Sequence, residues 1–238
     1  MLDFIGTIVI VAVTIASLNA LVTALAADRW SRLALAAAVG GWVGLAVALA
    51  SAGALAAAAG GAPVVGLMVA APLVIAAAAA FLLPAVRKAM LGAPLPLLVG
   101  LNIPRVLGVL FLLLAAESRL SGPFPYSAGW GDIITGLLAL PAAALAARPD
   151  HARIGLLHAW NAFGALDLFA AIAFGVTSAA GSPLQLIHAG VGSMAMQSLP
   201  WSLVPTVLVP FYLIMHGVIF AQLRTMNVRA AHPAPRPA

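Results

Sequence analysis

Three charged residues lie inside long apolar stretches of the chain, namely Arg105, Asp132 and Asp167. A charge at bilayer depth costs several kcal/mol unless it is paired or hydrated, so such residues indicate a functional site. At about 1.5 Å per helical residue, Arg105 and Asp167 lie about 15 and 20 Å from the same end of their stretches. We therefore expect the two to meet near the membrane midplane. They would form either a salt bridge that locks the helices together or part of a solute or proton site.

Asp132 lies about 5 Å inside the predicted start of its helix. An acidic residue there complements the helix dipole and can cap the helix. The neighbouring Gly129 and Gly131 leave room for another backbone to approach closely, so a role in the site stays open.

Asn102, Asn161 and His216 form a second polar level, which we expect to supply orienting hydrogen bonds. Asn102 precedes Arg105 by three residues, which puts both on one helix face. His158 points nearly opposite to Asp167, nine residues later, and is expected at the interface. The predicted site therefore comprises residues of solute binding or proton relay: Arg105, Asp167, Asn102, Asn161, His216 and Asp132. In it, Arg105 would bind an anionic group or keep Asp167 charged, and Asp167 would exchange the proton.

The spacing of the histidines does not indicate a metal or cofactor site. His158, His188 and His216 occur singly, without the paired spacing of zinc ligands, and the chain has no Cys. We predict neither a metal site nor a cofactor, with haem ligation by His158 and His216 as the alternative. Pro104 and Pro210 each remove a helical hydrogen bond, to the carbonyls of Gly100 and Thr206. Each produces either a simple kink or a cavity lined by free carbonyls.

The elements that must hold these residues are membrane helices. The chain of 238 residues is 64% hydrophobic and 7% charged, with a net charge of +5, whereas soluble domains carry about 25% charged residues. Its basic residues are scattered in pairs, which excludes a nucleic-acid partner. We predict an all-α bundle of seven transmembrane helices in the cell membrane, with the lipid bilayer and a small solute as partners. The predicted spans are 4–26, 33–59, 63–85, 95–116, 129–147, 154–178 and 202–223.

Basic residues predict the orientation of the bundle. Nine of them fall in loops or the tail on one side, against Arg119 alone on the other. The positive-inside rule then puts the N-terminus outside and the C-terminus in the cytoplasm, and we expect the bacterial inner membrane. Residues 183–199 are expected to form a short interfacial helix, either a connector or a lid, and residues 224–238 a disordered tail. Spans two and three, rich in Ala and Gly, are interpreted as a packing scaffold.

Seven spans with an outer N-terminus resemble the rhodopsins, but the only Lys, Lys88, lies in a loop. Zinc hydrolases of the ceramidase type need clustered His residues, which are absent. The length and orientation resemble the small SWEET sugar transporters, but their typical Pro-Gln pair is missing. The leading hypothesis is a small-solute transporter or permease with its site among spans four to seven. The alternatives are an intramembrane enzyme acting on a lipid or isoprenoid and a structural or assembly subunit.

Overall fold

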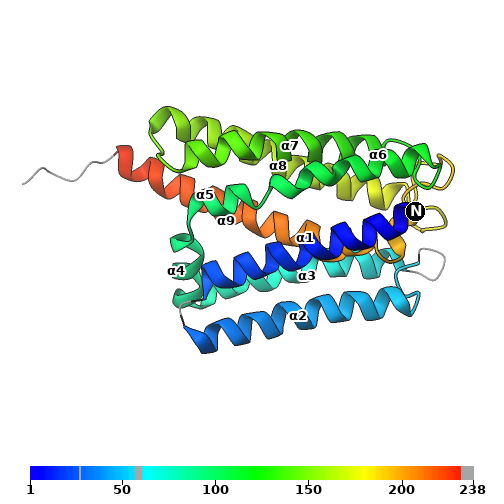
Figure 1. The fold of residues 1–238 in the computed structure, drawn as a ribbon, viewed down its shortest axis with the longest axis horizontal. Coiled ribbons are helices and arrows are strands. Elements are labelled where there is room, and N and C mark those ends of the chain that lie inside the picture. The colour runs from blue at the N-terminus through cyan, green and yellow to red at the C-terminus, as the bar shows by residue number, and fades with distance from the viewer. Residues whose placement is uncertain (27, 57–60, 232–238) are drawn as a thin grey trace, which may run out of the picture.

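The computed structural model describes residues 1–26, 28–56 and 61–231, and in this part the chain is helical without any strand. Seven of the helices are long and apolar enough to cross a membrane. They run roughly parallel or antiparallel to one another in a single bundle (Figure 1). The prediction of an all-α architecture with seven helices of spanning length is therefore confirmed.

Five spans are continuous helices: α1 (Leu2–Leu25), α2 (Arg29–Ser51), α3 (Gly61–Leu82), α7 (Phe124–Ala146) and α8 (His151–Thr177). The fourth is composite, with α5 (Leu95–Gly100), the 3₁₀ helix η2 (Ile103–Gly108) and α6 (Val109–Ala116) in succession. The seventh joins the π-helical η4 (Val204–Leu208) to α9 (Val209–Ala231). A short helix, α4 (Pro84–Gly92), connects the third and fourth spans, and η3 (Met194–Gln197) is a single 3₁₀ turn.

The two breaks follow from proline. Pro104 is the second residue of η2, and Arg105 N donates to Asn102 O at 3.0 Å in the tighter 3₁₀ pattern. Pro210 has no N–H for the carbonyl of Thr206, and the Trp42 indole donates to that carbonyl at 2.9 Å instead. The second proline therefore ties α2 to the seventh span, and the freed Thr206 carbonyl does not line a cavity as the cavity alternative required.

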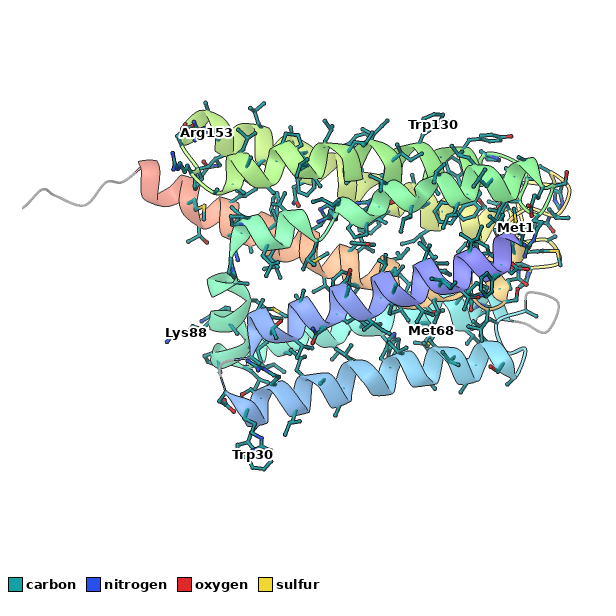
Figure 2. The ribbon with its side chains drawn as sticks, in the orientation of Figure 1. Met1, Trp30, Met68, Lys88, Trp130 and Arg153 are labelled. Carbon is teal, nitrogen blue, oxygen red and sulfur yellow. The ribbon has the colours of Figure 1, made fainter. Side chains whose placement is uncertain are left out.

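The basic loops gather at one end of the bundle. The α1–α2 turn, α4, the α7–α8 turn and the end of α9 lie together there, opposite the N-terminus (Figure 1). Lys88 and Arg153 are at this end, and Met1 is at the other (Figure 2). This separation agrees with the charge pattern on which the predicted orientation rests.

Two predicted segments differ from the structure. Residues 183–199 form turns and the single η3 turn rather than an interfacial helix, because Gly190 and Gly192 adopt positive φ angles of 65° and 57° that a helix does not accept. The predicted disordered tail begins too early, since α9 continues through Ala231. Its remainder, residues 232–238, lies outside the described residues.

The bounds of two helices also differ from the predicted spans. α2 begins at Arg29, not at residue 33, because Asp28 caps it by accepting hydrogen bonds from Trp30 N and Ser31 N. α2 ends at Ser51, and part of the predicted second span, residues 57–60, lies outside the described residues. α7 begins at Phe124, five residues before the predicted start at 129.

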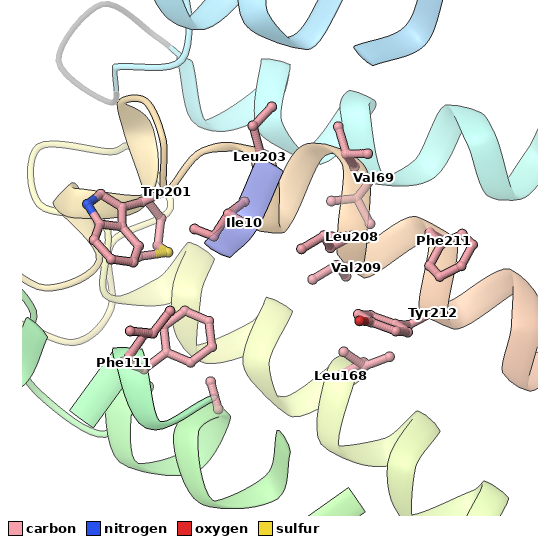
Figure 3. Close-up of a cluster of buried hydrophobic side chains, with 14 of the residues drawn as sticks. Ile10, Val69, Phe111, Leu168, Trp201, Leu203, Leu208, Val209, Phe211 and Tyr212 are labelled. Carbon is pink, nitrogen blue, oxygen red and sulfur yellow. The ribbon is translucent and has the colours of Figure 1, made fainter. Parts of the chain in front are cut away.

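The apolar core lies between α9 and its neighbours, where side chains such as Ile10, Phe111, Leu168 and Trp201 meet (Figure 3). α2 lies at the edge of the bundle, and Ala46 is its one buried residue in the described part (Figure 1). A Cβ atom at its Gly40, Gly41 or Gly44 would meet nothing within 4 Å. The expected close packing of small residues is therefore wrong for α2.

Candidate functional site

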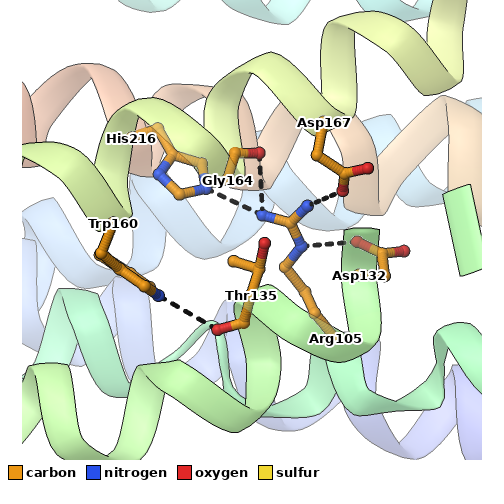
Figure 4. Close-up of polar contacts among 7 residues, drawn as sticks. All are labelled: Arg105, Asp132, Thr135, Trp160, Gly164, Asp167 and His216. Carbon is orange, nitrogen blue, oxygen red and sulfur yellow. Dashed lines mark hydrogen bonds and ion pairs between the residues drawn. The ribbon is translucent and has the colours of Figure 1, made fainter. Parts of the chain in front are cut away.

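Arg105 is the centre of a buried polar cluster. Its guanidinium is enclosed between two carboxylates: Nε donates to Asp132 Oδ1 and Nη2 donates to Asp167 Oδ2, both at 2.6 Å (Figure 4). Nη1 donates to the Gly164 carbonyl at 3.1 Å and to His216 Nε2 at 2.9 Å. Most N–H groups of the guanidinium are thus in use. The exposed fraction of the Arg105 side chain is 0%.

His216 is held in one neutral tautomer by its partners. A guanidinium can only donate, so Nε2 accepts from Arg105 and carries no proton. Nδ1 then carries the proton and donates to Asn161 Oδ1 at 2.8 Å, while Asn161 Nδ2 donates to the His216 carbonyl at 3.0 Å. Asn161 therefore fixes the ring orientation that lets His216 accept from Arg105.

Glycines on α7 let the other elements approach closely enough to form the cluster. A Cβ atom at Gly131 would overlap the carboxylate of Asp167 on α8, and it would lie 2.8 Å from Oδ2. One at Gly136 would lie 2.5 Å from Val106 N on η2. On α8, a Cβ atom at Gly164 would lie 2.7 Å from His216 Cε1. The cluster thus requires glycine at these positions, because a Cβ atom there would collide with its members or their backbone.

The charges of the cluster do not balance. Arg105 is always cationic, His216 is neutral in this arrangement, and two carboxylates face the single guanidinium. With both carboxylates ionised, the cluster carries one surplus negative charge in a region of low dielectric. Such a charge is costly unless a proton or another cation compensates it. One proton shared by the two carboxylates would remove this surplus charge.

The structure joins five of the six predicted site residues and leaves one aside. Arg105 and Asp167 pair as expected, and Asn161 and His216 complete the network. Asp132 is the ninth residue of α7, about 12 Å from its start, because that helix begins at Phe124. It is therefore no helix cap, and its carboxylate pairs with Arg105 instead.

Asn102 does not join the network. Its Nδ2 donates to the Leu98 carbonyl at 3.1 Å within its own segment. Its Oδ1, like Thr135 Oγ1, is buried without a hydrogen-bond partner in the described part of the chain. Spacing does not explain this difference, because side chains three residues apart eclipse in a 3₁₀ helix such as η2. The Asn102 amide is instead taken by a backbone carbonyl one turn earlier.

His158 lies apart from the cluster, as expected from its direction. Its ring meets Phe220 edge-on at 5.5 Å, and Asn227 Nδ2 lies 3.4 Å from its Nε2. Both ring nitrogens of His216 already have partners, so this arrangement does not offer the two histidines jointly to a haem iron. Within the described residues, no three His, Asp or Glu side chains come together as metal ligands.

A cavity lies beside the cluster, toward the end of the bundle that carries the N-terminus. Its volume is about 100 Å³, and Asp132 is among the residues that line it. Ser193 and Met196, from the segment that was expected to act as a connector or a lid, also line it. A smaller space of about 50 Å³ reaches Arg105 and Asp132 from the side of α1, and Trp201 contributes to its wall.

Trp201 is fixed at this end by the N-terminal turn of α1. Its indole N–H donates to Asp3 Oδ1 at 2.7 Å, and Arg119 Nη1 lies 2.8 Å from the same oxygen. The Arg119 guanidinium also lies 5.9 Å from the Trp201 ring centroid. These contacts hold Trp201 in the wall of the smaller space.

Sequence reasoning missed three contributors. Tyr212 places its ring 5.6 Å from the Arg105 guanidinium carbon. It precedes His216 by one helical turn, a spacing that could have revealed it. Gly164 contributes only a carbonyl, and no side-chain signal marks such a group. Trp160 donates to the Thr135 carbonyl at 3.1 Å and thereby joins α8 to α7 beside the cluster (Figure 4).

Comparison with known proteins gives a family without an assigned role. Residues 62–224 match the family described as Domain of unknown function (DUF8737), and the chain belongs to this family. No curated protein and no solved structure matches the chain. The matched range includes every residue of the polar cluster and leaves α1 and α2 outside.

Proposed function

We propose that the protein is a carrier that moves a small solute across the membrane and couples this movement to protons. The observation behind the proposal is the guanidinium of Arg105 held between Asp132 and Asp167, with Asp132 also lining a cavity. A site with one surplus negative charge favours either a proton or a cationic group, and alternation between the two is the chemistry of a coupled carrier.

In this proposal the residues have separate roles. Asp132 and Asp167 hold the exchangeable proton, and Arg105 keeps their carboxylates in place. Of the two roles considered for Arg105, the geometry favours holding Asp167 and argues against binding an anion, because the guanidinium is enclosed and its N–H groups are in use. Asn161 and His216 orient Arg105, so they are positioning residues.

The test uses purified protein in vesicles that carry a pH-sensitive dye inside and an imposed pH gradient. Small amines, amino acids, sugars and carboxylates are added singly, and the proton flux that each one triggers is recorded. We expect a solute-dependent flux with the wild type that Asp132→Asn and Asp167→Asn abolish. Asp28→Asn is the matched control, since it makes the same chemical change at a helix cap, where Asn serves as well as Asp. Equal flux in all variants, or none with any solute, would contradict the proposal.

An intramembrane enzyme acting on a lipid or isoprenoid is the second candidate, and the apolar walls of the cavity favour it. An acid–base mechanism needs a group free to accept or donate a proton. Both nitrogens of His216 are engaged, which leaves Asp132 as the group beside the cavity. Conversion of an added lipid by the protein in detergent, without any gradient, would favour the enzyme over the carrier.

A further inference from the structure

The cavity beside the cluster has the chemistry of a binding site for one class of molecule. Of the side chains that line it, in the part of the chain described, only Asp132 is charged. The other walls are almost entirely apolar: Ser193 and Gln197 are the polar side chains among them, and the Ser193 hydroxyl donates to the Gly175 carbonyl at 2.6 Å. A ligand there would bury an apolar body and present its polar end to Asp132.

The sign of that polar end follows from the bonds already made. Arg105 takes only Oδ1 of Asp132, and the second carboxylate oxygen points away from the guanidinium (Figure 4). Asp132 keeps an exposed side-chain fraction of 16%, whereas that of Arg105 is 0%. An entering molecule therefore meets a carboxylate and not a guanidinium, which favours a cation and disfavours an anion.

The size and the walls restrict the apolar part. A space of about 100 Å³ is of the order that accepts a body of the size of one benzene ring. The rings of Phe111 and Phe124, with centroids 5.8 Å apart, line this space and suit edge or face contacts with an aromatic body.

We propose that the site binds a small hydrophobic amine as its ammonium cation, with the charge on Asp132 and the apolar body against Phe111 and Phe124. This inference rests on the proposed carrier function and names its substrate class. When the ammonium ion enters, the carboxyl proton leaves to the solvent, so one positive charge replaces another. The cluster stays neutral with either occupant.

Calorimetric titration of the purified full chain in detergent with benzylamine tests the inference. Benzyl alcohol and benzoate are the matched probes, since they keep the ring and change only the charge. We expect saturable binding of benzylamine, with an affinity at least tenfold above that of either probe. Titration in two buffers of different ionisation enthalpy should show release of about one proton per bound cation.

Two variants test separately how the charge of Asp132 and the walls of the cavity contribute to binding. Asp132→Asn should lower the affinity for benzylamine at least tenfold and abolish proton release, and Asp28→Asn should change neither. Val65→Phe narrows the cavity without altering its charge and should weaken binding while keeping proton release for the amine that still binds. Size-exclusion profiles and helical circular dichroism matching the wild type ensure that each variant is folded.

Several results would overturn the inference. Benzoate binding as tightly as benzylamine would show an anion site, and unchanged affinity in Asp132→Asn would place the amine elsewhere. Absence of benzylamine binding, together with a vesicle proton flux that another solute triggers and Asp132→Asn abolishes, would refute the substrate class and leave the carrier function standing. Benzylamine binding without any transmembrane flux would refute the carrier function and leave the binding site standing.

Discussion

Replacing Gly131 by Ala tests whether the cluster depends on close contact between α7 and α8. The new methyl group would overlap the Asp167 carboxylate, whose Oδ2 accepts from Arg105 at 2.6 Å. The carboxylate must move, and breaking a buried ion pair costs about 3–5 kcal/mol. Ala gains about 1 kcal/mol over Gly in a helix. We therefore expect the free energy of unfolding to fall by about 2–4 kcal/mol.

The assay is unfolding by SDS in mixed micelles, followed by tryptophan fluorescence. Gly155→Ala on α8 is the matched control, because a Cβ atom there meets nothing within 4 Å. It should leave the unfolding free energy unchanged or raise it by up to about 1 kcal/mol. Repeating Gly131→Ala in an Asp167→Ala background removes the group that is displaced, so the penalty should disappear. The same penalty in both backgrounds, or none in the wild type, would refute the steric reasoning.

Three further predictions use the same preparations. Arg105→Lys keeps the charge but loses the planar fork, and it should lower the unfolding free energy by about 2–3 kcal/mol in the SDS titration. Trp201→Phe removes the donor to Asp3, so amide hydrogen exchange in the first turns of α1 should become faster. Hydrogen bonds from Ser31 and the backbone N–H groups of Ser31 and Trp30 lower the pKa of Asp28. The stabilisation that Asp28→Ala removes should therefore be full above the ordinary Asp pKa of about 3.9. It should fade as the pH falls through the lowered value, measured as the difference in unfolding free energy between wild type and variant.

The cluster could be predicted from the sequence because isolated charges within apolar segments are rare and must find partners. That argument identifies Arg105, Asp132 and Asp167 without any knowledge of the packing. Depth along the helices correctly brings Arg105 to Asp167. It misplaces Asp132, because composition does not reveal that α7 starts at Phe124, where apolar and turn-forming residues are mixed.

The partners of each hydrogen bond could not be predicted, since they depend on backbone geometry that periodicity does not contain. Asn102 has a favourable spacing from Arg105, yet its amide donates to the Leu98 carbonyl and not to a member of the network. The carbonyl of Gly164 has no side chain to mark it. The loop 183–199 repeats apolar residues at helical intervals, yet the positive φ angles of Gly190 and Gly192 determine its path.

The second carboxylate allows a test of whether the cluster is functional or structural. One Asp would neutralise Arg105, and a second adds a charge that a purely structural lock does not need. Asp132→Asn keeps an oxygen that accepts from Arg105 Nε and removes the surplus charge. If the cluster is a site, this variant should be as stable as the wild type, or more stable by up to about 1 kcal/mol, and should lose coupled proton flux. A loss of about 2 kcal/mol or more in SDS unfolding, with flux retained, would instead show that both carboxylates serve to hold the bundle together.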